Sequence, residues 1–250
     1  MRLISSAASR VEVVYGENGL PYILKTILDG DEGKILEKIQ GVQGVCKLYY
    51  TQRKTQGQTM LYLKKYEMDL LDRVTHETLP PLSPSDILKM MLQVSRTLVK
   101  LLNEFQLCHG DLKPDNLFLD KDKKILLGDF GHAVSSKERV RRLIGTADYQ
   151  APEVPHFQRL EVCPKAADVY ALGVTLWMTL FQYSPFTNVR GLSEDFGIND
   201  LPTKHINQDS VDFFKSQEGL STLLEGMLQR DPTKRPSMED VATTLSSMCS

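Results

Sequence analysis

The stretch His-Gly-Asp-Leu-Lys-Pro-Asp-Asn, residues 109–116, decides how the rest of this chain is interpreted. It brings an imidazole, two carboxylates, an ammonium and an amide together between apolar runs at residues 98–107 and 117–119. Polar groups held between two buried segments are costly unless they are paired or used. Taken alone, the stretch also fits a solvated turn, in which Asp, Asn and Pro are common.

A second polar motif, Asp-Phe-Gly at residues 129–131, follows the run Ile-Leu-Leu-Gly at residues 125–128. Isoleucine and leucine bounded by turn formers predict a short buried strand. A carboxylate at the end of this strand, with an Asp and an Asn in the loop before another strand, can converge on one divalent cation. Magnesium takes oxygen ligands, usually one or two carboxylates together with substrate phosphates.

These two motifs resemble the catalytic loop and the metal-binding motif of eukaryotic-type protein kinases. Asp111 and Asp129 lie eighteen positions apart (129 − 111), which suits that family. Residues 145–153, Gly-Thr-Ala-Asp-Tyr-Gln-Ala-Pro-Glu, resemble the run that closes the activation segment of serine/threonine kinases.

Two later motifs extend the resemblance. Asp168 opens an apolar stretch similar to the central helix of the large lobe, where an aspartate holds the backbone of the catalytic loop. Arg235 lies in a run similar to the late arginine motif, and the resemblance implies that it pairs with Glu153. The resemblance covers residues 3–246, so nearly the whole chain is included.

The resemblance implies an α+β, bilobal protein-kinase-like fold, with a small β-rich N-lobe and a larger, mainly α-helical C-lobe. We expect one kinase domain over residues 1–250, divided into an N-lobe of residues 1–66 and a C-lobe of residues 67–250. The residue patterns independently predict a hairpin over residues 11–27, a helix over 32–40, a strand over 61–63, a long helix beginning after Ser83 and a final helix beginning after Ser237.

ATP contacts are implied by the same resemblance. Lys25 matches the strand lysine that contacts the α- and β-phosphates, although an outward-facing lysine on a half-buried strand is the alternative. Glu32 matches the carboxylate that holds this lysine, with Glu37 as the alternative partner.

The glycine-rich loop of the family is degenerate in this chain. Ile4, Ser6 and Ser9 stand at its glycine positions, and Val11 stands at its valine position. We expect Ser6, Ser9 and Val11 to contact the nucleotide, together with Ile23, which is bulkier than the alanine usual two residues before the lysine. These changes predict a stiffer phosphate lid, a narrower adenine slot and weaker ATP binding.

The resemblance implies phosphoryl transfer from ATP with Mg²⁺ to a serine or threonine of a protein substrate. Asp111 would orient the acceptor hydroxyl or take its proton, and Asn116 and Asp129 would hold the metal. Lys113 would reach the γ-phosphate. Lys113 and Thr146 together form the serine/threonine pattern.

Gly110 replaces the arginine that usually precedes the catalytic aspartate and reads a phosphate on the activation segment. Residues 135–142 are polar and mobile in character. We therefore expect activity that is largely independent of phosphorylation of this segment (a non-RD kinase).

Composition excludes several other classes. The chain has 250 residues, 41% of them hydrophobic and 25% charged, with a net charge of −2, which gives no reason to expect nucleic-acid binding. It has neither a secretory signal nor an apolar run long enough to span a bilayer, so we expect no membrane association and a cytoplasmic or nuclear location. Its four cysteines form no CxxC pair, which predicts neither a zinc site nor a disulfide framework.

Three alternatives stay open. A pseudokinase, acting as a scaffold or allosteric regulator, fits the missing glycines and Gly110. A small-molecule kinase of the aminoglycoside phosphotransferase type shares the H-x-D-x-x-x-x-N loop, but residues 151–153 and Arg235 argue against it. The acidic residues Glu67, Asp69 and Asp72 form either a solvated face or a site for basic substrate side chains.

Overall fold

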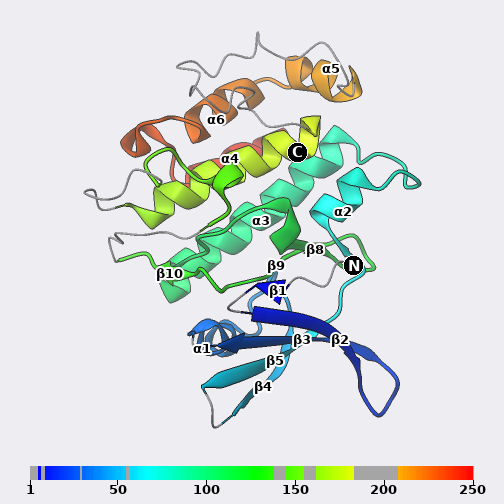
Figure 1. The fold of residues 1–250 in the computed structure, drawn as a ribbon. Coiled ribbons are helices and arrows are strands. Elements are labelled where there is room, and N and C mark those ends of the chain that lie inside the picture. The colour runs from blue at the N-terminus through cyan, green and yellow to red at the C-terminus, as the bar shows by residue number, and fades with distance from the viewer. Residues whose placement is uncertain are drawn as a thin grey trace.

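A computed structural model of the protein describes residues 5–6, 9–28, 30–54, 57–137, 145–154, 162–182 and 208–249. Within them, a sheet of five strands lies at one end of the molecule and a body of helices at the other (Figure 1). This is the α+β, two-lobed arrangement that the sequence predicted.

The sheet has the order β1-β2-β3-β5-β4, and all its pairings are antiparallel. Its strands are β1 (Ser5–Ser6), β2 (Ser9–Tyr15), β3 (Pro21–Leu28), β4 (Leu48–Arg53) and β5 (Gln58–Lys64). The predicted hairpin is β2–β3, whose turn contains Gly19 at φ +73°, a value that glycine adopts without a steric cost. Strand β4 was not predicted from the sequence.

Helix α1 (Glu32–Lys38) packs directly on this sheet. A Cβ on Gly33 would lie 3.2 Å from a methyl of Leu61 and 3.3 Å from one of Thr59, both on β5. Glycine at this position therefore lets the helix backbone come close to the sheet. The other end of the helix is tied to β4, because Glu37 accepts hydrogen bonds from Thr51 and Arg53.

The helical body is built around α3 (Pro84–Phe105) and α4 (Pro164–Phe181). Ser83 caps α3 by accepting a hydrogen bond from the Asp86 N–H at 3.1 Å, as the Ser-Pro start predicted. Helix α4 is buried along almost its whole length. The other α-helices of the described residues are α2 (Leu70–Thr75), α5 (Gln208–Ser216), α6 (Leu220–Met227) and α7 (Met238–Met248). Ser237 and Asp240 form a capping box at the start of α7.

Two small sheets lie between the five-stranded sheet and the helical body. One has the order β6 (Met68–Asp69), β8 (Leu117–Leu119) and β9 (Ile125–Leu127), and the other pairs β10 (Val134–Ser135) with β7 (Leu107–Cys108). Strand β9 also bonds to the segment after α1, since the Cys46 N–H donates to the Leu127 carbonyl at 2.9 Å. The Asp-Phe-Gly motif thus follows a strand that contacts both halves of the molecule.

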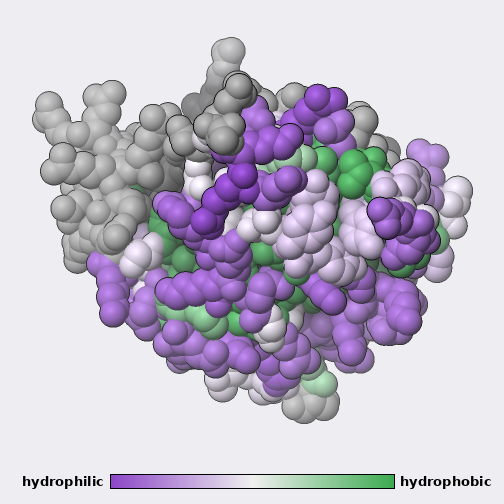
Figure 2. All heavy atoms as spheres, turned by 90° about the horizontal axis from the view of Figure 1, so that it is seen from below, coloured by the Kyte–Doolittle hydropathy of each residue, from purple (hydrophilic) through white to green (hydrophobic). Residues whose placement is uncertain are grey.

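The surface on the side of the five-stranded sheet is mainly hydrophilic, with small pale and green areas between the charged side chains (Figure 2). All four cysteines are free. Among the described residues, no helix is both long enough and apolar enough to cross a bilayer.

Candidate functional site

Lys25 is bound by two carboxylates that come from different halves of the molecule. Its ammonium lies 2.8 Å from Glu32 on α1 and 2.8 Å from Asp129, which follows β9. Lys25 is only 8% exposed, so the outward-facing alternative does not apply. A lysine ammonium has three N–H donors. They face three carboxylate oxygens, because both oxygens of Glu32 and Oδ1 of Asp129 lie 2.8 Å from the Lys25 nitrogen.

The three charged groups shift one another's pKa values. Burial by itself would lower the pKa of Lys25, but the carboxylates of Asp129 and Glu32 outweigh burial and raise it. Burial opposes ionisation of Asp129, yet the Lys25 ammonium prevails and lowers the pKa of that carboxyl. In Glu32 burial prevails over the ammonium and raises the pKa. At neutral pH the cluster therefore keeps a firmly charged lysine beside Asp129, whose side chain is 42% exposed.

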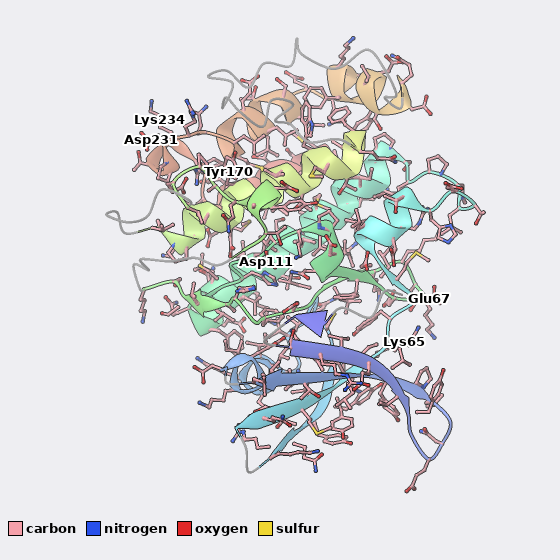
Figure 3. All side chains as sticks on the ribbon, viewed as in Figure 1. Lys65, Glu67, Asp111, Tyr170, Asp231 and Lys234 are labelled. Carbon is pink, nitrogen blue, oxygen red and sulfur yellow. The ribbon has the colours of Figure 1, made fainter. Side chains whose placement is uncertain are left out.

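Asp111 lies between the sheet and helix α4 (Figure 3) and is held at both of its carboxylate oxygens. Oδ1 accepts hydrogen bonds from the N–H of Thr146 at 2.7 Å and from its hydroxyl at 3.0 Å. Oδ2 lies 3.2 Å from the Asn116 amide nitrogen and 3.3 Å from the Lys113 ammonium. Lys113 also donates to the Thr146 hydroxyl at 2.7 Å. The three residues expected from the sequence to be catalytic thus form one hydrogen-bonded group.

The hairpin β8–β9 brings Asn116 and Asp129 together. Leu117 pairs with Leu127, and just beyond this pair the Gly128 N–H donates to the Asn116 carbonyl at 2.9 Å. The side-chain N–H of Asn116 donates a hydrogen bond to the Asp111 carbonyl at 2.8 Å, so the amide oxygen of Asn116 is not used in that bond. Asp129 binds Lys25 through Oδ1, which leaves Oδ2.

This pair of oxygen donors fits a divalent cation. An amide oxygen and a carboxylate oxygen are ligands that magnesium accepts, provided that phosphates complete its coordination. In the described part of the chain no cluster of three or more His, Cys, Asp or Glu side chains could hold a metal.

The backbone around Asp129 and the catalytic loop is fixed by buried contacts. Asp129 has a left-handed φ of +57°, and Phe130 after it is fully buried with its ring edge-on to His109, centroids 5.0 Å apart. Asp168 on α4 accepts from the His109 N–H at 2.7 Å and from the Gly110 N–H at 2.9 Å. Burial raises the pKa of Asp168 even though it accepts these two N–H donors. The contact between Asp168 and the loop was expected from the sequence and is present.

The residues expected to form the phosphate lid are only partly described. Ile4 lies outside the described residues, and for Ser6 only the strand β1 is given. Ser9 and Val11 lie in β2, where Val11 pairs with Lys25 and therefore shares its face of the sheet. Ile23 lies two residues before Lys25 on that same face.

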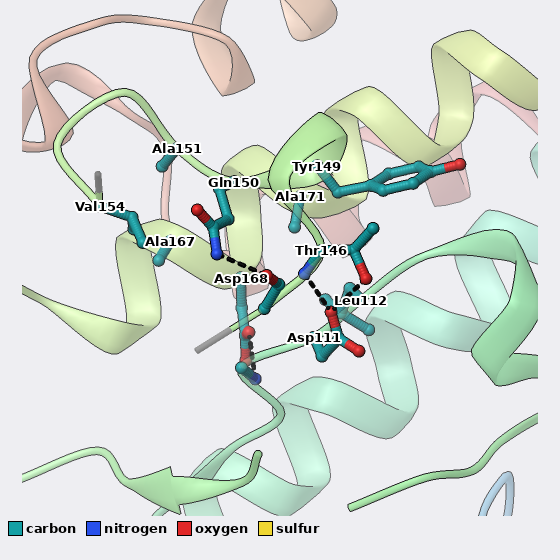
Figure 4. Close-up of a pocket in the computed structure, with 12 residues that line it drawn as sticks. Asp111, Leu112, Thr146, Tyr149, Gln150, Ala151, Val154, Ala167, Asp168 and Ala171 are labelled. Atoms are coloured by element: carbon teal, nitrogen blue, oxygen red, sulfur yellow. Dashed lines mark hydrogen bonds between the residues drawn. The ribbon is translucent and has the colours of Figure 1, made fainter. Parts of the chain in front are cut away.

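Beside Asp111 the structure contains a small pocket with about 320 Å³ of space free of atoms, part of it open to solvent (Figure 4). Its walls come from the catalytic loop, from the run that closes the activation segment and from α4: Gly110, Asp111, Leu112, Gly145, Thr146, Tyr149, Gln150, Ala151, Val154, Ala167, Asp168 and Ala171. Gln150 crosses it to donate to the Gly145 carbonyl at 2.6 Å. Gln150 was not expected from the sequence, because its place in the pocket depends on how the segment folds back.

A second buried ion pair lies farther from Asp111. Arg235 binds Glu153 through two parallel bonds of 2.7 Å, as the resemblance implied. The guanidinium also donates to the carbonyls of Gln229, Ala166 and Arg230, and its carbon lies 4.9 Å from the centre of the Tyr170 ring. Tyr170 lies on α4 (Figure 3).

The prediction that residues 135–142 are mobile is wrong for Ser135 and Ser136. Ser135 belongs to β10 and pairs with Leu107, and Ser136 is only 8% exposed. The Ser136 N–H donates to the carbonyl of Gln106 at 2.7 Å. Polar residues suggested a solvated loop, but backbone pairing with the segment after α3 holds this part in place. Residues 138–142 lie outside the described part.

The alternative prediction, that Glu37 is the partner of Lys25, is wrong. It binds Thr51 and Arg53 on β4, because it points from the far end of α1 toward that strand.

Comparison with known proteins gives a consistent result. Residues 25–245 match the family model described as protein kinase domain, and residues 1–24 lie outside this match. Three relatives are each covered only in part by this chain. It is 33% identical over 145 residues to serine/threonine-protein kinase PDK1 of Cryptococcus neoformans, covering 54% of this chain and 11% of the relative. It is 33% identical over 180 residues to ovarian-specific serine/threonine-protein kinase Lok of Drosophila melanogaster (69% and 36%). It is 34% identical over 166 residues to serine/threonine-protein kinase ULK3 of Xenopus laevis (62% and 32%).

Proposed function

This chain belongs to the protein kinase family, and from that premise we propose that it transfers the γ-phosphate of ATP to a serine or threonine hydroxyl of a protein, without requiring a phosphate on its activation segment. We propose further that residues 1–250 act as one kinase domain, with an N-lobe of residues 1–66 and a C-lobe of residues 67–250. The proposal includes a protein with a serine or threonine acceptor as the substrate.

The observation that supports this most is the convergence of the Lys25 cluster. The Lys25 ammonium lies 2.8 Å from both carboxylate oxygens of Glu32 and from Asp129 Oδ1, so Asp129 Oδ2 is left for a metal that binds together with phosphates. A buried ion pair adds little net stability. A scaffold that never handled a nucleotide would therefore have no use for a buried lysine shared by two carboxylates.

The acceptor side of the reaction is assigned to Asp111, Lys113 and Thr146. Asp111 Oδ2, the oxygen not bonded to Thr146, would orient the substrate hydroxyl and take its proton. Lys113 lies 3.3 Å from Asp111 and would neutralise charge on the phosphoryl group being transferred. Thr146 would keep both side chains in place, since it bonds to both. Phosphoryl transfer demands mainly positioning and charge stabilisation, which this group supplies.

The nucleotide side is assigned to Lys25, Glu32, Asn116 and Asp129, with Ser6, Ser9, Val11 and Ile23 against the rest of the nucleotide. Asn116 and Asp129 would hold Mg²⁺ through their remaining oxygens, and when bound the ion neutralises charge on the phosphates. Glu32 keeps the Lys25 ammonium directed toward Asp129.

The test is transfer of radiolabelled phosphate from ATP with Mg²⁺ to a generic basic protein, using phosphatase-treated chain. Wild type should transfer phosphate to serine and threonine, and Asp111→Asn should lose at least about a hundredfold in rate, as removing one such group does. A rise in thermal stability with ATP and Mg²⁺ should accompany binding in both proteins.

The competing function, a pseudokinase scaffold, is favoured by Ile23 and by the serines at the glycine positions. Absence of transfer by wild type, or equal transfer by wild type and Asp111→Asn, would establish it. Requirement for a phosphate on the segment would refute the independence from phosphorylation while leaving transfer intact.

A further inference from the structure

Gly110 lies in direct backbone contact with both ends of the activation segment, residues 129–153. A Cβ on Gly110 would lie 2.3 Å from the carbonyl oxygen of His132, which follows the Asp-Phe-Gly motif. A Cβ on Gly145, just before Thr146, would lie 2.9 Å from the carbonyl oxygen of Gly110. Both distances are shorter than side chains tolerate, and both meet backbone atoms that cannot rotate away. Gly110 therefore makes room for the backbone at His132, and Gly145 makes room for the backbone at Gly110.

The conformation of Gly110 adds a second constraint. Its φ is +79°, in the region that glycine occupies freely and other residues enter only with strain. Asp168 holds its N–H from the side of α4, at 2.9 Å. The backbone of the loop is thus bound by Asp168 on one side and packed against His132 on another, and it has no freedom to yield to a side chain.

The start of the segment is anchored by neutral contacts. Val134 and Ser135 pair with Cys108 and Leu107, and the Ser136 N–H donates to Gln106 at 2.7 Å. In the described residues no cation contacts this anchor. The end of the segment is anchored separately through Thr146, which binds Asp111 with its N–H and hydroxyl.

We propose that Gly110 is a positioning residue: its missing side chain lets the two ends of the activation segment pack against the catalytic loop, and this backbone contact positions Asp111 against Thr146. The inference rests on the proposed function. Two interpretations of Gly110 can be distinguished. If the glycine only replaces the usual arginine, a side chain at this position would be tolerated or would add regulation by phosphorylation. If the glycine is a packing contact, any side chain at this position displaces the activation segment.

The experiment compares Gly110→Ala and Gly110→Arg with Gly41→Ala in the full chain. Gly41 is the matched control, because its φ is also positive, at +84°, but a Cβ there meets nothing within 4 Å. Gly41→Ala therefore reproduces the backbone strain alone. Turnover, KM for ATP and hydrogen exchange at the amide of Ser136 are measured for each.

We expect both Gly110 variants to lose about a hundredfold in kcat, the effect that a displacement of about 1 Å from the reacting geometry produces. KM for ATP should change much less, because Lys25 and Glu32 do not touch Gly110. Exchange at Ser136 should accelerate in the Gly110 variants and stay at the wild-type rate in Gly41→Ala, whose kcat should also be unchanged. A purely structural role would lower thermal stability without this split between kcat and KM.

Gly145→Ala tests the same contact from its other side and serves if a Gly110 variant does not fold. It should lower kcat in the same direction. Wild-type kcat and wild-type exchange in Gly110→Arg, or in Gly145→Ala where Gly110 variants do not fold, would overturn the inference. If wild type transfers no phosphate, the proposed function fails, and exchange at Ser136 alone then decides the packing role of Gly110.

Discussion

Two buried ion pairs in this molecule use their cations in different ways. Arg235 has five N–H groups and meets five acceptors: two oxygens of Glu153 and the carbonyls of Gln229, Ala166 and Arg230. Lys25 has three N–H groups and lies 2.8 Å from three carboxylate oxygens, two of Glu32 and one of Asp129. The first cation is saturated by one carboxylate and three carbonyls, and the second is shared by two carboxylates from different halves of the molecule.

Their surroundings differ in the same sense. The Arg235 side chain is completely buried, while its partner Glu153 is 16% exposed. The Lys25 side chain is 10% exposed, but one of its partners, Asp129, is 42% exposed and opens the cluster to solvent. A planar, bidentate guanidinium suits a permanent structural contact, whereas an ammonium is a compact charge that can share acceptors. The Arg235 pair is thus a closed contact inside the helical body, and the Lys25 cluster is a contact between the two halves of the molecule that solvent reaches at Asp129.

The largest effect is expected from breaking the saturated pair. Arg235→Met should lower the free energy of unfolding by about 3–5 kcal/mol, because Glu153 and three carbonyls lose their donors. Urea denaturation measures this, with Lys234→Met as the control at an exposed neighbouring position. A loss below about 1 kcal/mol, the usual value for surface pairs, would place Arg235 in the same class as an exposed contact.

A smaller effect, and of another kind, is expected from Lys25→Met. ATP affinity should fall by about 10- to 100-fold, since a hydrogen bond to a charged group contributes about 1.5–3 kcal/mol. The free energy of unfolding should change less than in Arg235→Met, because Glu32 has a raised pKa and can protonate instead of staying charged. Calorimetric titration with ATP and Mg²⁺ checks the affinity. Lys34→Met removes an exposed ion pair with Asp31 and should change nothing, so equal affinities in all three proteins would end the distinction drawn above.

The smallest effect is a pH dependence carried by Glu32. Its pKa in the folded protein is raised above the ordinary value of 4.5, so the folded state holds this proton more tightly than the unfolded chain. The free energy of unfolding should therefore decrease as pH rises from 4.5 through the folded pKa. Glu32→Gln has no such proton, and its stability relative to wild type should grow over that range. Urea titrations at several pH values measure the difference; if the stability of Glu32→Gln falls relative to wild type as pH rises, Lys25 prevails over burial at Glu32.

Much of the fold could be predicted from local sequence. Alternation and turn residues located the hairpin β2–β3, and apolar spacing with the caps Ser83 and Ser237 located α3 and α7. These signals lie within a few residues of the structure they specify, so no distant contact is needed to recognise them. Strand β4 was missed because its exposed pattern is explained only by pairing with β5.

In the candidate site, too, some features could be predicted from the sequence and others could not. The motifs that contain Lys25, Asp111, Asn116 and Asp129 could be recognised in the sequence by their resemblance to the protein kinase family, because such a resemblance depends on residue type and spacing. Tertiary structure alone decided that Lys25 is shared by two carboxylates rather than one, that Ser136 is anchored rather than mobile, and that the space beside Gly110 is filled by the His132 backbone. The physical reason is that these outcomes depend on how closely chain segments far apart in sequence approach one another, and a difference of about an ångström in that approach separates an empty space from a steric contact.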